Sequence, residues 1–255
     1  MVDDHDMSSR PRKERFAAHN AIDARYQQSA HLVGVQLTIP TIPSIYYGTE
    51  QAFDGSEDYH DYTIEPRRFA EDRYVREDMF GGPFGAFCTT GCHFFNPRHP
   101  TYLRIAALAR LRNRKDSIGL TLRRGTAYGR EVSFDGGSFV FPSPKGQIVA
   151  WSLLLFDREI VVCLNTHGVE PRAAEITIDH FLNPEKVPLV VLYRGDWSDE
   201  QLASPPEDEH VPVRRHPEGR ATFSIHLPPA GMAILTGSGE SLLSQQGLPG
   251  VPHLP

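Results

Sequence analysis

The chain has 255 residues, which is long enough for one large domain or two small ones. Apolar residues make up 40% of it and charged residues 23%, the balance of an ordinary globular protein, and the formal net charge is −6. No run of lysines and arginines offers a basic face to phosphates, so we expect no nucleic-acid partner. No apolar run reaches the roughly 18 residues that cross a bilayer, so we expect no membrane partner.

The two chain ends carry little structural signal. Met1 is followed by acidic residues rather than by basic and then apolar ones, so the sequence shows no signal peptide. A cytoplasmic location is the expectation, although the sequence says little about compartment if further residues precede Met1. Residues 238–255 are rich in Gly, Ser and Pro, which predicts a flexible tail.

Three cysteines, Cys88, Cys92 and Cys163, are too few for a disulfide framework. Cys88 and Cys92 are four residues apart, and His93 adjoins them. A structural zinc site needs four ligands at tighter, paired spacing, so we interpret these cysteines as free thiols. We expect no metal site and no cofactor in this chain.

Good helix formers fill residues 12–28 and predict an α-helix there. The more apolar segment 31–39 extends the same pattern. Pro40 and Pro43 are expected to end the helix, because proline has no N–H to donate to a helical ladder.

The short run 44–47 contains Ile and Tyr, is apolar on both sides and ends at Gly48. That pattern is typical of a strand in a buried parallel sheet. A second helix is predicted to begin at Pro100, since the fixed φ of proline suits a first helical turn. We expect its packing face to consist of Tyr102, Ile105, Ala106 and Ala109.

After Asp116 the pattern changes to short apolar or alternating segments separated by glycine-containing turns, such as Asp135-Gly136-Gly137. Many short strands with this punctuation predict a β-sandwich or barrel of about 100 residues. The predicted strands are residues 139–141, 148–156, 159–165, 175–178, 189–193 and 221–227.

Two segments carry most of the functional signal. Residues 1–6 end in His5-Asp6, and alone they are typical of a solvated acidic chain end. Residues 42–51 contain Tyr46-Tyr47-Gly48, and alone they are typical of a buried strand followed by a glycine turn.

As an ordered pair with a helix between them, the two segments resemble the α-amylase superfamily, glycoside hydrolase family thirteen. Residues 2–6 resemble the end of the family's seventh barrel strand, which finishes in His-Asp. Residues 40–50 resemble its eighth strand, although Thr41 stands where the family usually has Gly. The matching positions are Pro40, Ile42, Pro43, Ile45, Tyr46, Tyr47, Gly48 and Glu50.

The resemblance extends over nearly the whole chain except the tail. Residues 72–80, 102–112, 127–130 and 228–235 are similar to later family segments. It implies that residues 1–116 are the C-terminal remnant of a TIM (β/α)8 barrel, with strands seven and eight and the last helices. Residues 117–237 would form the antiparallel β-sandwich called domain C.

By the resemblance, Asp6 is the family's third catalytic carboxylate and His5 is a substrate-binding residue. Asp6 would accept hydrogen bonds from sugar hydroxyls, and these bonds strengthen as the ring approaches its oxocarbenium-like transition state. His5 would donate to a hydroxyl of the same sugar. Asp6 and Glu50 would end neighbouring strands and face one barrel mouth. The implied substrates are α-glucans or malto-oligosaccharides.

A complete barrel of this type needs about 250 residues, so 116 residues cannot hold one. The resemblance places the nucleophile, the acid and the calcium site on absent upstream segments. We therefore expect an N-terminally truncated retaining glycosidase or transglycosylase that is inactive by itself.

Two other interpretations remain. The chain could be a non-catalytic carbohydrate-binding protein built from a barrel remnant and a sandwich. It could also be a purely structural β-protein in which the two motifs are coincidental, and then Asp6 and Glu50 would not share a barrel mouth.

Overall fold

A computed structural model describes residues 3, 15–19, 24–55, 76–82, 85–87, 89–142, 146–216 and 219–239. Contacts divide the chain into two compact units. Unit 1 comprises residues 1–36 and 42–106, and unit 2 comprises residues 37–41 and 107–255. The division between the units falls between residues 106 and 107, before the boundary predicted after residue 116. The predicted domain boundaries at 116/117 and 237/238 stay predictions. None of the described helices is long and apolar enough to span a membrane.

The first helix begins later than predicted. In the described part of residues 12–28, Phe16–His19 forms only the 3-10 turn η1, and the α-helix α1 spans Arg25–Thr38. The backbone before η1 is bonded to distant residues: the Arg15 N–H donates to the Asp54 carbonyl at 3.0 Å. A long-range bond of this kind takes the place of a helical one. The predicted extension over 31–39 is confirmed as far as Thr38.

The strand predicted at 44–47 is wrong. These residues form no strand, and the neighbouring Ile42 is 95% exposed while Ile45 is 43% exposed. A barrel strand needs hydrogen-bond partners on both sides, and the described residues of unit 1 contain only isolated bridges, Asp78 with Gly85 and Phe80 with His93. The barrel remnant is therefore not confirmed.

The second long helix begins where the sequence predicts. Helix α3 spans Pro100–Arg112 and carries Arg110 and Arg112 in its last turn, where the helix dipole favours positive charge. Its buried face differs from the predicted one. The buried positions begin at Thr101 and recur every three or four residues along the helix, and this spacing leaves Tyr102 on the exposed side. The buried residues are Thr101, Ile105, Ala107, Leu108 and Leu111.

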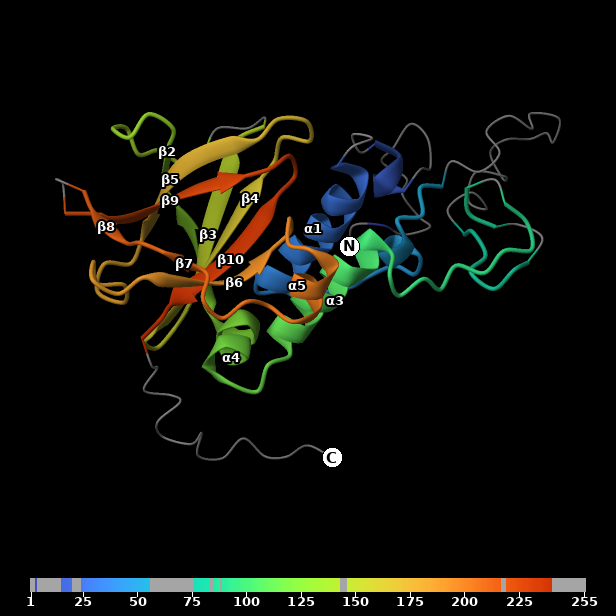
Figure 1. The fold of residues 1–255 in the computed structure, drawn as a ribbon, viewed down its shortest axis with the longest axis horizontal. Helices are drawn as coiled ribbons and strands as arrows, with labels where there is room; N and C mark the ends of the chain where they lie inside the picture. The colour runs from blue at the N-terminus through green and yellow to red at the C-terminus, as the bar shows by residue number, and fades with distance from the viewer. Residues whose placement is uncertain are drawn as a thin grey trace. The chain divides into compact units, whose positions relative to one another are not determined.

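The predicted β-sandwich is confirmed in unit 2 (Figure 1). One sheet has six antiparallel strands in the order β1-β3-β4-β10-β6-β7, and the other has four in the order β2-β5-β9-β8. The larger sheet comprises β1 (Thr126–Arg130), β3 (Ile148–Leu155), β4 (Arg158–Asn165), β10 (Met232–Gly237), β6 (Leu189–Arg194) and β7 (His210–Val211). The smaller sheet comprises β2 (Val132–Ser133), β5 (Arg172–Ile178), β9 (Ala221–Leu227) and β8 (Arg214–Arg215).

The side chains of the smaller sheet alternate between buried and exposed positions, whereas the central strand β4 of the larger sheet is buried along nearly its whole length. Along β9, Ser224 and His226 are exposed and their neighbours are buried, so one face points to the core. Nearly all of β4 is buried, since it lies between β3 and β10 in the sheet. Of the six predicted strands, only 139–141 fails to form one, contributing an isolated bridge between Val132 and Val140.

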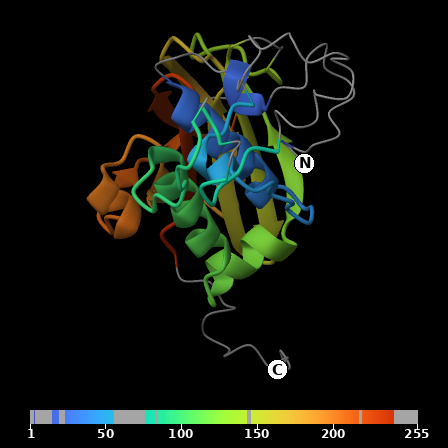
Figure 2. The same cartoon turned by 90° about the vertical axis from the view of Figure 1, so that its right-hand side faces the viewer.

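Two helices in unit 2 were not predicted. Helix α4 (Ser117–Arg124) begins at Asp116, whose side chain accepts a hydrogen bond from the Gly119 N–H at 3.1 Å. It lies against β3 and β4 (Figure 2). The short helix α5 (Asp199–Ala203) starts with a capping box in which Ser198 and Gln201 bond reciprocally. Both caps were readable signals in a region dominated by strand patterns.

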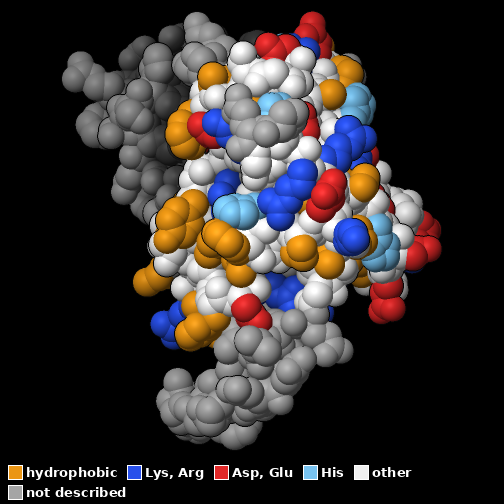
Figure 3. Space-filling view, turned by 90° about the vertical axis from the view of Figure 1, so that its left-hand side faces the viewer, with side chains coloured by type: hydrophobic (Ala, Val, Ile, Leu, Met, Phe, Trp, Pro, Cys, Tyr) orange, Lys and Arg blue, Asp and Glu red, His pale blue; other side chains and the backbone are white. Residues whose placement is uncertain are grey.

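The surface of the face in Figure 3 is mixed. Hydrophobic side chains lie singly or in small groups among lysines, arginines and carboxylates on that face. Such a distribution is typical of ordinary solvent-exposed protein surface.

A buried carboxylate, that of Glu159 on β4, joins several parts of the sandwich. It accepts hydrogen bonds from Arg130 on β1 at 2.6 Å and from Ser152 on β3. Its other oxygen accepts from the Asp179 N–H at 2.9 Å and the Asn183 amide at 2.5 Å. Strands β1, β3 and β4 and the segment after β5 therefore share one charged group.

We predict that Glu159→Ala lowers the free energy of unfolding by about 3–5 kcal/mol, because it leaves Arg130 and three other donors without their acceptor. The measurement is urea denaturation followed by tryptophan fluorescence. Both tryptophans, Trp151 and Trp197, lie in unit 2. Glu170→Ala is the control, since its ion pair with Arg172 is exposed, and it should change stability little. Equal effects of the two variants would contradict the role of Glu159.

Candidate functional site

The structure describes only part of the predicted site. His5 and Asp6 lie outside the described residues, as does Cys88. Asp3 and residues 40–51 are described, and all belong to unit 1 except Pro40 and Thr41. The geometry on which the site depends is therefore that of Asp3 and the segment around Tyr46–Glu50.

Asp3 connects the two sequence motifs. Its carboxylate is buried, and Oδ2 accepts a hydrogen bond from the Thr49 hydroxyl at 3.0 Å. Oδ1 accepts from the Phe16 N–H at 2.7 Å. These two hydrogen bonds come from different segments of the chain and hold residue 3 beside residue 49. The sequence interpretation did not single out Asp3, although its position just before His5-Asp6 was a usable signal.

The glycine of the second motif is required by its surroundings. Gly48 has φ +81°, which L side chains rarely adopt, and a Cβ there would lie 2.4 Å from Phe53 Cδ2. Its carbonyl accepts hydrogen bonds from the N–H groups of Gln51 and Phe53, each at 3.0 Å. The chain thus turns sharply into the 3-10 turn η3 (Thr49–Gln51), which places Glu50 in a half-buried position directly after Thr49.

The two tyrosines of the motif pack on a buried cation. The Arg15 guanidinium lies 4.7 Å from the ring centroid of Tyr46 and 5.1 Å from that of Tyr47. Its Nη1 donates to the Tyr47 carbonyl at 2.6 Å. Cation–π contacts of this kind strengthen when water is excluded. Burial raises the pKa of both tyrosines, so both are neutral phenols at ordinary pH.

Glu77 balances the charge of Arg15. The Arg15 Nε donates to Glu77 Oε2 at 2.7 Å, and both side chains are fully buried. The other carboxylate oxygen accepts from the Gly55 N–H at 2.8 Å. Burial raises the pKa of Glu77 above its usual value, because the loss of water outweighs the favourable effects of Arg15 and Gly55.

The described groups of unit 1 form a framework more than a reacting pair. Hydrogen bonds join Arg15, Glu77 and Asp3 to the backbone, Asp3 to the Thr49 hydroxyl and Arg15 to Glu77, so these groups hold residues 46–50 in place. Among the described residues, no group of three or more His, Cys, Asp or Glu side chains could hold a metal ion. Cys92 is exposed and Cys163 is buried, and both are free thiols.

Solved structures share this fold at low sequence identity. The chain aligns over 92% of its length with the cyclomaltodextrin glucanotransferase CldA, at 17% identity and a TM-score of 0.54, and covers 35% of that chain. It aligns over 92% with a variant of the trehalulose synthase MutB, at 13% identity and a TM-score of 0.56, and covers 42% of that chain. It aligns over 89% of its length with the gamma-CGTase from alkalophilic Bacillus clarkii, at 16% identity and a TM-score of 0.50, and covers 25% of that chain.

The chain therefore spans well under half the length of these three structures. The sequence matches no protein-family model and none of the curated proteins. A structural likeness at 13–17% identity shows a common fold and leaves the activity of this chain to be inferred.

We predict that Asp3 and Thr49 are energetically coupled. Asp3→Ala should cost about 1–3 kcal/mol, because the buried Thr49 hydroxyl and the Phe16 N–H lose their acceptor. In a double-mutant cycle with Thr49→Val, the coupling should be about 0.5–3 kcal/mol. The measurement is hydrogen-exchange protection of the Phe53 N–H, which donates to Gly48 in the adjoining turn. Asp4→Ala is the neighbouring acidic control. Additive effects of the two substitutions would contradict the contact.

The raised pKa of Glu77 predicts a particular pH dependence. A carboxyl whose pKa is raised by folding binds its proton more tightly in the folded state, so its contribution to stability is full below the ordinary value of 4.5. That contribution is lost as the pH rises through the raised pKa. The difference in unfolding free energy between wild type and Glu77→Gln should therefore fall with rising pH, measured by denaturation followed by circular dichroism. A difference that grows with pH would mean that Arg15 dominates instead.

Proposed function

We propose that this chain forms part of an α-amylase-type glycoside hydrolase or transglycosylase acting on α-glucans or malto-oligosaccharides. The observation that carries the proposal is the hydrogen bond between Asp3 and Thr49, which joins the segment ending in His5-Asp6 to the segment ending in Glu50. Two sequence motifs that resemble neighbouring barrel strands are thus in contact in space. The shared fold with a cyclomaltodextrin glucanotransferase and a trehalulose synthase supports the same conclusion.

In this proposal Asp6 is the carboxylate that stabilises the transition state. It accepts hydrogen bonds from sugar hydroxyls, and these bonds strengthen as positive charge develops on the sugar ring. His5 donates to a hydroxyl of the same sugar in both the ground state and the transition state. The framework of Asp3, Arg15 and Glu77 holds the neighbouring segment in position, which is how a site gains the precise geometry that catalysis needs.

Retaining hydrolysis also needs a nucleophile and an acid about 5 Å apart. By the family resemblance, neither belongs to these 255 residues. The chain by itself is therefore expected to release no reducing sugar from soluble starch, and activity is expected only from a polypeptide that supplies the two further carboxylates.

The test is steady-state kinetics on one malto-oligosaccharide, using the chain expressed with whatever coding sequence precedes it in frame. We predict that Asp6→Asn lowers kcat by about a hundredfold to a thousandfold, with a smaller effect on substrate binding, because Asn carries no charge to strengthen in the transition state. His5→Ala should do less, since its contact exists before and during the reaction. Asp4→Asn, which makes the same charge change two residues away, is the control.

Retention of more than about a tenth of the wild-type kcat by Asp6→Asn would contradict the assignment. A protein that binds malto-oligosaccharides without cleaving them would favour the non-catalytic carbohydrate-binding alternative. A protein that does neither would leave the two motifs as coincidence.

A further inference from the structure

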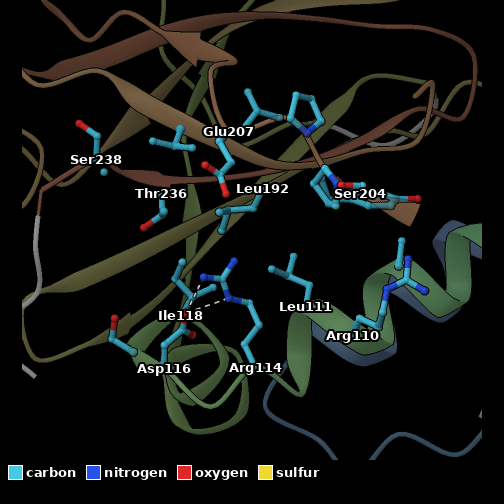
Figure 4. Close-up of a pocket in the computed structure, with 18 of the residues that line it drawn as sticks. Arg110, Leu111, Arg114, Asp116, Ile118, Leu192, Ser204, Glu207, Thr236 and Ser238 are labelled. Atoms are coloured by element: carbon cyan, nitrogen blue, oxygen red, sulfur yellow. Dashed lines mark hydrogen bonds and ion pairs between the residues drawn. The ribbon is translucent and has the colours of Figure 1, made fainter. Parts of the chain in front are cut away.

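A cavity of about 700 Å³ lies wholly within unit 2, and none of the residues of the proposed glycosidase site lines it. Its volume is in the range of about 300–1,000 Å³ that is typical of small-molecule sites. One wall consists of the last turns of α3 and the start of α4 (Figure 4). The opposite wall consists of β6, the end of β10 and the segment that follows α5.

The cavity is lined by more positive than negative side chains. Arg110, Arg114 and Arg158 line it, against the carboxylates of Asp116 and Glu207. Arg114 is already paired with Asp116, since its Nε donates to Asp116 Oδ2 at 2.8 Å, and this pair lies at one side of the cavity in Figure 4. Two guanidinium groups therefore remain against the single carboxylate of Glu207.

Arg158 is the most informative of these groups. The residue is only 8% exposed, yet its Nε has no hydrogen-bond partner among the described residues. The rest of the guanidinium is fixed: Nη1 donates to the Gly237 carbonyl at 2.8 Å, and Nη2 donates to the Gly239 carbonyl at 3.1 Å. Gly237 and Gly239 also line the cavity. A charged donor that is buried, oriented and without a partner among the described residues is rare in folded proteins, and an added acceptor beside this guanidinium would be stabilising.

The remaining lining suits the body of a compact ligand. Leu111, Ile118 and Leu192 form an apolar part of the wall, and Ser204 and Ser238, at opposite sides of the view, add hydroxyl groups (Figure 4). Tyr193 is the only aromatic residue among the described residues that line the cavity, and it is buried. An α-glucan chain would find no exposed aromatic ring there on which to pack its sugar rings.

We propose that this cavity binds a small organic anion whose phosphate or carboxylate group is held by Arg158, while Arg110 adds positive charge to the lining. The planar guanidinium fork matches both phosphate and carboxylate geometry, and the cavity is larger than an inorganic ion requires. The body of the ligand covers the apolar wall of Leu111, Ile118 and Leu192. The proposal goes beyond the proposed glycosidase function and stands independently of it.

The test is calorimetric titration of the full chain with glucose 6-phosphate, gluconate, glucose and inorganic phosphate. The first two distinguish a phosphate from a carboxylate source, and at least one should bind about tenfold more tightly than glucose or inorganic phosphate. Arg158→Lys keeps the charge but removes the Nε donor and the fork, and it should weaken binding about tenfold or more. Glu207→Gln should tighten binding about twofold or more, because it removes a repelling charge.

Glu185→Gln is the matched control, since Glu185 is exposed, makes the same charge change and does not line the cavity. If Arg158→Lys fails to fold, Glu207→Gln and Arg110→Ala decide the matter, because both residues are exposed. Arg110→Ala should weaken binding.

The proposal is overturned if neither organic anion binds below about 10 mM, if glucose binds as well as they do, or if Glu207→Gln behaves like Glu185→Gln. Asp6→Asn should leave anion binding unchanged, so this test and that of the glycosidase site fail independently.

Discussion

The complete burial of the Arg15 guanidinium is the constraint on which the described part of unit 1 depends. A cation removed from water must be met by a counter-charge and by acceptors for its N–H groups, or the fold loses several kcal/mol. Glu77 supplies the charge, and the Tyr47 carbonyl accepts from Nη1. The rings of Tyr46, Tyr47 and Phe53 lie over the guanidinium. Segments far apart in the sequence are thereby fixed around one side chain.

Unit 2 also contains a fully paired buried charge, but there the charge is negative. There the buried carboxylate of Glu159 is met by Arg130, Ser152, Asn183 and the Asp179 N–H. Arg158, its neighbour in sequence, is buried, and its Nε has no partner in the described part of the chain. In each satisfied case the charge is matched by several hydrogen bonds, and such networks favour one arrangement of their segments over others. In our proposal, the guanidinium of Arg158 is the group that binds an anionic ligand.

The sandwich was largely predictable, and unit 1 was not. In the sandwich, alternation and short apolar runs reflect strands that pair with near neighbours, so five of the six predicted segments are strands. In unit 1 the apolar run at 44–47 gave the same signal, but no neighbouring strand pairs with it in the described residues. The periodicity of apolar residues indicates which side chains will be buried, but it does not indicate whether a second strand is available for pairing. Asp3 was missed for a related reason, since its bond to Thr49 joins residues 46 positions apart.

The sequence by itself determined the β-sandwich, the start of α3 at Pro100 and the resemblance of residues 1–6 and 40–50 to α-amylase-type strand ends. These features depend on local propensity, on the period of apolar residues and on short motifs, all of which can be identified from consecutive residues. The tertiary structure decided the late start of α1, the turn at Gly48, the buried pair of Arg15 with Glu77 and the cavity around Arg158. Each of these depends on which distant groups meet in a water-excluded interior, where an unmatched charge or an extra Cβ costs more than local propensity can offset.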